Sequence, residues 1–131
     1  MKFKPGDTAS LAKTISDADI RAFADATGDR NPLHLDEEFA KQTRFGRRVA
    51  HGMLSASLIS AVIASEMPGQ GSIYLGQTLQ FVAPVFLGDT VTARVTVSAV
   101  REDKPILTLE TVCTNQRNEV VIKGEATVLI S

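Results

Sequence analysis

Residues 53–67 read MLSASLISAVIASEM and set the architecture of the domain. The stretch is apolar on nearly every side, with small Ala and Ser residues spread through it. A helix of this kind belongs in the interior of a domain, and its small residues let other backbone approach closely. We therefore predict a central helix over 52–67, which Pro68 and Gly69 end.

The chain after Gly71 has the composition of β-strands. Strands are predicted over 72–82, 90–101, 106–114 and 119–130. The second of these alternates cleanly, with its apolar side chains on one face: Val91, Ala93, Val95, Val97 and Ala99. Because the connections are short, we expect an antiparallel meander with one packed face.

One buried helix followed by a long antiparallel sheet has a simple solution. The sheet must curl around the helix, since neither element can hide its apolar face alone. The predicted fold class is α+β, with a short strand over 8–14 added to the sheet. An edge strand left over would favour pairing with a second copy, so we expect a homodimer.

Size and composition describe a single domain over 1–131. The formal net charge of -1 argues against a nucleic-acid binder, which usually shows a basic excess. The single cysteine, Cys113, is interpreted as a small buried hydrophobe rather than a nucleophile. The N-terminus carries charge where a signal peptide needs an apolar run, and the apolar stretch 53–64 is too short to span a bilayer, so we expect a cytoplasmic protein without membrane contact.

A short amphipathic helix is predicted before the polar part of the chain. Ser16 begins a capping-box pattern with acidic residues behind it. Gly28 is the expected end of this helix. The side chains at helical spacing between them are Ile20, Phe23, Ala24 and Thr27.

The stretch from Asp29 to His34 holds a carboxylate, a carboxamide and an imidazole, with Asn31 between the other two. Pro32 forces Asn31 out of the α region, so the chain must bend here. Each residue also has a purely structural interpretation: Asp29 and Asn31 could be turn formers, and His34 could be a structural histidine. His51 is interpreted as a structural residue at the entry of the central helix.

Beyond this bend, Asp36 can cap a brief helix over 37–42, with Leu35 and Phe39 packing inward. The segment 43–49 is irregular and basic, and we expect an overhanging loop. Its three arginines could form either a solvated loop or a patch for an anionic ligand group: Arg44, Arg47 and Arg48.

Three blocks resemble one known family: GDRNPLHLDEEFA at 28–40, FGRRVAHGML at 45–54 and YLGQTLQFVAPVFLGDTV at 74–91. They are similar to the (R)-specific enoyl-CoA hydratases of the MaoC-like, hot-dog fold group, in particular to its single-domain members of the polyhydroxyalkanoate type. The resemblance covers the chain from about residue 8 to its end. It implies a hot-dog fold, a homodimer and reversible hydration of trans-2-enoyl-CoA to (R)-3-hydroxyacyl-CoA.

By this resemblance, Asp29 and His34 form the catalytic dyad, and Asn31 positions one of them. The backbone N–H of Gly52 would receive the thioester carbonyl, and Ser60 would line the active-site end of the acyl pocket. Further candidates for the walls of that pocket are Ile63 and Val128, although both also suit core packing. Gly52 could instead serve close packing, and Ser60 could bond back to the helix backbone.

Hydration of a conjugated thioester needs a base for water, an acid for the α-carbon and stabilisation of the enolate oxygen. The dyad could supply the first two, and a helix N-terminal amide the third. No metal ligand spacing or cofactor motif is present in the sequence, so we expect neither. The alternatives left open are another conjugated thioester, branched or carrier-protein-bound; a thioesterase; and a non-catalytic acyl-thioester-binding module. The sequence does not decide which dyad member is the base, nor the acyl length.

Overall fold

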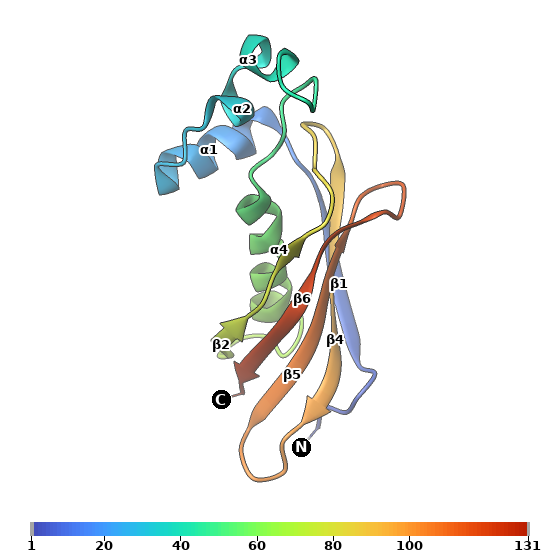
Figure 1. Ribbon diagram of the computed structural model, residues 1–131. Helices are drawn as coiled ribbons and strands as arrows, with labels where there is room; N and C mark the ends of the chain where they lie inside the picture. Colours follow the sequence, from blue (N-terminus) through green and yellow to red (C-terminus); the bar gives the residue numbers. More distant parts are fainter. Residues whose placement is uncertain (1, 131) are drawn as a thin grey trace.

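The computed structural model describes residues 2–130. One strand is followed by four helices and then by five strands, and the longest helix lies against the sheet (Figure 1). In chain order these elements are β1 Thr8–Thr14, α1 Asp17–Thr27, α2 Pro32–Leu35, α3 Glu37–Lys41, α4 Gly52–Ser65, β2 Ile73–Gln77, β3 Gln80–Phe81, β4 Thr90–Val100, β5 Ile106–Thr114 and β6 Val120–Leu129.

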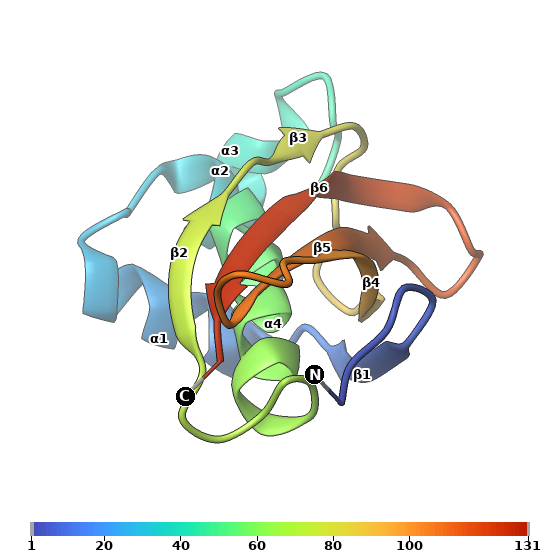
Figure 2. The ribbon, with the colours of Figure 1, turned by 90° about the horizontal axis from the view of Figure 1, so that it is seen from below.

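One six-stranded sheet has the order β1-β4-β5-β6-β2, with β3 also paired to β6. Every pairing is antiparallel. Seen from below, the sheet curves around α4, which lies against its concave face (Figure 2). The predicted wrap of an antiparallel sheet around one long helix is therefore confirmed, and so is the strand over 8–14.

The predicted meander is wrong at its first connection. The strands β2 and β3 pair with β6, on the opposite side of the sheet from the β1 edge, and the chain then crosses to begin β4. The predicted single strand 72–82 is also broken, at Thr78 and Leu79. Gly124 explains this break, because a Cβ atom there would lie 1.9 Å from the carbonyl oxygen of Thr78. A glycine in β6 thus admits the carbonyl and lets the chain turn.

The core lies between the sheet and α4. On β4 the side chains of Val91, Val95 and Val97 are buried as predicted, but Ala99 is exposed. A register shift between Val97 and Ala99 accounts for this, since it turns the following residue to the other face. Cys113 is fully buried, as expected.

The central helix ends at Ser65, close to the predicted end, but one side of it stays uncovered in the single chain. The exposed stripe is formed by Met53, Ser57, Ser60 and Ala64. The opposite side packs into the core through Ile59, Val62 and Ile63. No helix of the described residues is long and apolar enough to cross a membrane.

The helices α1–α3 cover the N-terminal end of α4 (Figure 1). The predicted capping box is present: Ser16 Oγ accepts from the Asp19 amide at 3.1 Å. Gly28 ends α1 with a φ of 82°, in the left-handed region where glycine is favoured. Asp36 caps α3 as expected, but the prediction that Phe39 packs inward is wrong, because its side chain is 45% exposed on that short helix.

Candidate active site

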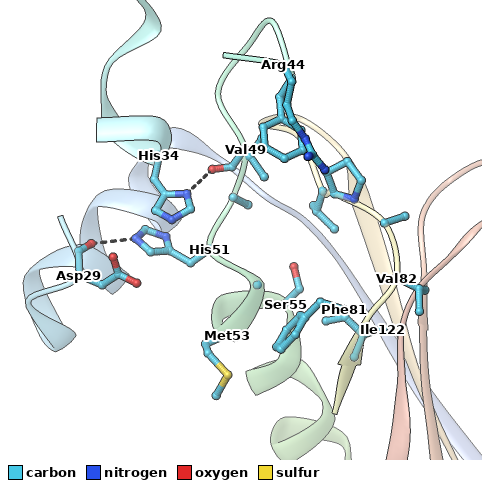
Figure 3. A pocket seen from close by; sticks show the side chains of 16 residues that line it. Asp29, His34, Arg44, Val49, His51, Met53, Ser55, Phe81, Val82 and Ile122 are labelled. Atoms are coloured by element: carbon cyan, nitrogen blue, oxygen red, sulfur yellow. Dashed lines mark hydrogen bonds between the residues drawn. The ribbon is translucent and has the colours of Figure 1, made fainter. Parts of the chain in front are cut away.

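A cavity of about 500 Å³ opens where the N-terminus of α4 meets the turn after α1 and the segment after β3 (Figure 3). Its polar groups gather at the α1–α2 side, and its other walls are mostly apolar. The lining residues are Asp29, His34, Arg44, Phe45, Val49, Ala50, His51, Gly52, Met53, Ser55, Phe81, Val82, Ala83, Pro84, Val85 and Ile122. The cavity therefore unites the predicted dyad with the predicted carbonyl site.

Asp29 stands directly after the glycine that ends α1. Its amide donates to Thr27 Oγ1 at 3.2 Å, and its carbonyl oxygen lies 2.9 Å from His51 Nε2. The carboxylate itself is exposed and lines the cavity. The backbone of this residue is thus held on both sides, while the acidic group stays free to face a ligand.

His34 is carried by α2, the single turn that follows the bend. Asn31 starts this turn: its side-chain oxygen accepts from the Leu33 amide at 3.1 Å, and its carbonyl accepts from the His34 amide at 2.9 Å. His34 Nδ1 lies 2.6 Å from the carbonyl oxygen of Val49. A carbonyl can only accept, so Nδ1 carries the proton and Nε2 is left with a free lone pair.

The surroundings of His34 favour its neutral form. Burial of the ring lowers the pKa of His34 below its ordinary value of 6.5, and the nearby His51 lowers it further. The bond to Val49 and the Asp29 carboxylate act in the other direction but do not reverse the shift. A neutral imidazole with a free Nε2 can act as a base near neutral pH.

His51 is fully buried behind the dyad. Its Nε2–H donates to the Asp29 carbonyl, and its ring centroid lies 4.0 Å from that of His34 and 4.8 Å from that of Phe23. The structure therefore agrees with a structural role, and adds that this residue joins the Asp29 backbone to the His34 ring immediately before α4.

Gly52 is the first residue of α4, and its backbone is accessible from the cavity. Within residues 2–130 its N–H has no protein acceptor, as expected of a helix N-terminus, where the helix dipole adds partial positive charge. The ring of Phe81 lies across the glycine: a Cβ atom at position 52 would be 2.8 Å from Phe81 Cδ1 and Cε1. Position 52 thus has room for a side chain only if the Phe81 ring moves.

Asp29, His34 and His51 also have the ligand types of a metal site. Each offers one atom, and these atoms lie within 4.8 Å of one another. Both imidazoles already donate one N–H to a backbone carbonyl, as metal-ligating histidines usually do. Metal–ligand bonds of about 2.0–2.1 Å require that two ligand atoms lie no more than about 4.2 Å apart. Any pair of these atoms at the upper limit of 4.8 Å would therefore have to move closer together to bind one ion. No metal was expected from the sequence, because no ligand spacing was recognised and His51 was assigned only to the helix entry.

The other predicted site residues lie outside this cavity. Asn31 is exposed and acts through the backbone of α2. Ser60 lines a neighbouring hollow of about 490 Å³ between α4 and β2, which shares Met53 with the first cavity. Ile63 and Val128 are buried in the core between α4 and the sheet.

The three arginines of the 43–49 segment have three different surroundings. Arg48 is buried, donates to the His34 carbonyl at 2.7 Å and pairs with Asp17 at 2.6 Å, which lowers the pKa of Asp17. Arg47 lies over the Phe86 ring, 3.8 Å from its centroid. Arg44 lines the cavity and makes none of the ion pairs found within residues 2–130. A general basic patch is therefore absent from these described arginines, and Arg44 alone faces the site.

The sequence did not point to several lining residues. Phe81 and Val82 come from a stretch that was assigned to a plain strand, and the crossover that brings them over Gly52 was not foreseen. Ser55 was one of four serines on an apolar helix, with no signal to separate it from the others. Only the helix phase, fixed by packing, turns its side chain into the cavity.

Known proteins share both the sequence and the fold. A family model described as MaoC like domain matches residues 4–120. The (R)-specific enoyl-CoA hydratase of Rhodospirillum rubrum is 53% identical over 127 residues, covering 97% of this chain and 88% of that protein. The enzyme of the same name from Aeromonas caviae is 52% identical over 123 residues, covering 94% and 92%. A solved structure of an (R)-hydratase from A. caviae involved in PHA biosynthesis has a TM-score of 0.97 and 49% identity, covering 99% of this chain and 98% of that one.

The sheet wrapped around its central helix is the hot-dog fold of the MaoC-like hydratase structures. An enzyme of the hydro-lyase class is the type of protein that this fold and these relatives define. The chain belongs to the MaoC-like domain family. The resemblance noted in the three sequence blocks is thereby confirmed at the level of the family.

Proposed function

We propose that the chain is an (R)-specific enoyl-CoA hydratase that adds water across trans-2-enoyl-CoA and gives (R)-3-hydroxyacyl-CoA, reversibly. One observation carries the proposal: the Asp29 and His34 side chains lie within 4.8 Å of each other in the same cavity as the free amide of Gly52. The (R) configuration is taken from the relatives. Asp29 and His34 are its catalytic residues.

The spacing of the dyad suits one shared water molecule. Two hydrogen bonds of about 2.8 Å from a tetrahedral water reach acceptors about 4.6 Å apart. The ligand atoms of Asp29 and His34 lie within 4.8 Å. Both are acceptors, because His34 has its proton on Nδ1, so each can take one hydrogen of the same water.

The lone pair on His34 Nε2 makes this residue the base. As the water oxygen attacks the β-carbon, one water proton passes to Nε2, and the π electrons move onto the thioester oxygen. The imidazolium then returns a proton to the α-carbon as the enolate collapses, so that one water is added and His34 is restored. Asp29 accepts the other water hydrogen, orients the water and stabilises the transient imidazolium. Proton transfer by a positioned side chain is typically worth about 10²–10⁴-fold.

Gly52 would receive the thioester oxygen on which negative charge develops. Its N–H has no protein acceptor and stands at the positive end of a helix of 14 residues. Arg44, on the loop that borders the cavity, is available to the phosphates of CoA. We assign Ser60 to the acyl side of the site, where Met53 lines both the catalytic cavity and the hollow that Ser60 lines. Ile63 and Val128 line neither and are left to core packing.

A homodimer forms part of the proposal. The edge strand β2 exposes Ile73, Tyr74 and Leu75, next to the uncovered stripe of α4. A second copy that pairs along β2 would bury both surfaces. We expect Leu75→Glu to give a monomer in light scattering after size exclusion, whereas Val120→Glu, also at an exposed apolar position, leaves the dimer intact.

Turnover of crotonyl-CoA tests the activity. The wild-type chain is expected to remove the ultraviolet absorbance of the enoyl thioester and to yield the (R) product on a chiral column, while Asp29→Asn and His34→Ala nearly abolish both. Release of free thiol instead of loss of the double bond would make the chain a thioesterase. No loss of absorbance with acyl lengths from four to about twelve carbons would contradict the proposal.

The CoA assignment has its own experiment. Arg44→Ala should raise KM for crotonyl-CoA but leave KM for the crotonyl thioester of N-acetylcysteamine unchanged, because that substrate has no phosphate. Arg47→Ala is the matched control, since its guanidinium is held over Phe86. Equal effects of the two variants on both substrates would remove Arg44 from the phosphate site.

A further inference from the structure

Two buried side-chain polar atoms within residues 2–130 have no hydrogen-bond partner: His51 Nδ1 and Ser55 Oγ. Both residues line the catalytic cavity: His51 is the N-cap of α4, and Ser55 follows four positions later in its first turns. Buried polar groups are almost always paired in folded proteins, so each exception needs an explanation. Their meeting in one cavity indicates that this cavity is built for a polar ligand atom.

Ser55 is the less expected of the two. It is fully buried, and in Figure 3 its hydroxyl points away from the helix into the cavity. It stands three residues after Gly52, and side chains on a helix tilt toward the N-terminus, so the hydroxyl reaches back toward the turn that carries the free amide. The neighbouring serine Ser57 behaves differently, because it is exposed and donates to the Leu54 carbonyl at 2.6 Å.

The cavity's polar atoms divide into acceptors and donors. The Asp29 carboxylate, His34 Nε2 and His51 Nδ1 are acceptors, because each imidazole has its proton on the nitrogen that donates to a backbone carbonyl. Near the first turn of α4, the free donors include the Gly52 N–H and the Ser55 O–H. An oxygen that gains negative charge needs donors, so it is drawn to this pair.

We infer that Ser55 is a catalytic residue whose hydroxyl donates to the thioester oxygen beside the Gly52 amide, and so forms the second half of an oxyanion hole. The inference rests on the proposed function, which places the thioester carbonyl at Gly52. In the substrate-bound state, the thioester oxygen would then be the hydrogen-bond acceptor that the Ser55 hydroxyl otherwise lacks. This role also explains why a polar side chain is kept at a fully buried position on an otherwise apolar helix face.

Ser55→Ala tests this role, with Ser65→Ala, at an exposed serine of the same helix, as the control and Ser55→Cys as a variant of similar size with a weaker donor. We expect Ser55→Ala to lower kcat about 10²-fold, the usual cost of one oxyanion donor, with KM changed less than about threefold. Its Tm should rise, because a buried hydroxyl without a partner is lost. Ser65→Ala should change neither kcat nor the order of acyl-chain preference, and the kcat of Ser55→Cys should fall between that of the wild type and that of Ser55→Ala.

The infrared carbonyl band of bound butyryl-CoA, labelled with ¹³C at the thioester carbon, gives a readout that does not depend on turnover. The band should lie at lower frequency in the wild type than in Ser55→Ala, because a donor polarises the bond. An unchanged band, an unchanged kcat, or a loss of kcat together with a lower Tm would overturn the role of Ser55. Absence of hydration in the wild type would overturn the proposed function instead, while the carbonyl band would still decide whether Ser55 contacts the thioester.

Discussion

Replacing Gly52 with alanine tests how the carbonyl site is shaped. A Cβ atom would lie 2.8 Å from Phe81 Cδ1 and Cε1, whereas carbon atoms prefer about 3.5–4.0 Å. The ring must therefore retreat by about 1 Å. A misplacement of about 1 Å in an active site can cost about 10²-fold in rate, which is the fall in kcat/KM that we expect for Gly52→Ala. Because Phe81 is 52% exposed and free to swing, Tm should change little.

The double variant separates crowding from other effects. Phe81→Ala alone should cost less than about tenfold, and Gly52→Ala/Phe81→Ala should recover most of the lost activity, since the added methyl then has room. The two changes are thus expected to be strongly non-additive in steady-state hydration of crotonyl-CoA, as contacting residues usually are. If the double variant is as slow as the product of the two single effects, the contact between Phe81 and Gly52 does not control access to the amide.

Three further predictions concern groups around the site and the fold. The chain has only two histidines, so ¹H–¹³C NMR should resolve both. We expect the pKa of His34 to lie below 6.5. It should be lower again in Asp29→Asn, because the Asp29 carboxylate raises the pKa of His34. Because the pKa of His34 is lower in the folded chain than in the unfolded chain, the free energy of unfolding should decrease as the pH falls below about 6.5. Denaturant titration measures this, and a free energy of unfolding that does not change from pH 7 to pH 5 would contradict the shift. Gly124→Ala should lower Tm and disturb the β2–β3 pairing with β6 in hydrogen exchange, because its Cβ would meet the Thr78 carbonyl at 1.9 Å; wild-type Tm would disprove the close approach. Burial raises the pKa of Cys113 to about 12, so thiol reagents should modify the unfolded chain but leave folded activity intact, and rapid inactivation would show that the thiol is accessible.

The wrap and the polar turn could be predicted because each depends on local pattern. An apolar helix and alternating strands have one economical packing, and Pro32 forces the bend that brings Asp29 and His34 to one side. The path after β3 could not be predicted, since a short connection is compatible with a hairpin as well as with the crossover that occurs. The break between β2 and β3 was hidden as well, because it depends on Gly124, whose role is invisible until Thr78 is placed beside it.

The site's supporting contacts were hidden for another reason. Arg48 bonds to Asp17 and to the His34 carbonyl, partners 31 and 14 positions away, and nothing in a basic loop identifies which arginine will be buried. The serines of the central helix could not be told apart either. A helix that is apolar all round has no preferred face, so its sequence does not tell whether Ser55 or Ser60 will point at the dyad.

The two halves of α4 have different roles: the later turns contribute to stability, and the first turns contribute to the site. Its later turns bury Ile59, Val62 and Ile63, and full burial of such a side chain contributes about 1.5–3 kcal/mol. Its N-cap and first turns hold the free Gly52 amide, an unpartnered imidazole nitrogen and an unpartnered hydroxyl, and each of the last two, being buried, costs about 1–3 kcal/mol. These unpartnered groups lie at the positive end of the helix dipole, next to the dyad residues Asp29 and His34 that follow α1 and stand on α2. A helix anchored by its apolar end can tolerate unsatisfied groups at the other, and unsatisfied groups facing a cavity are what a reacting thioester requires.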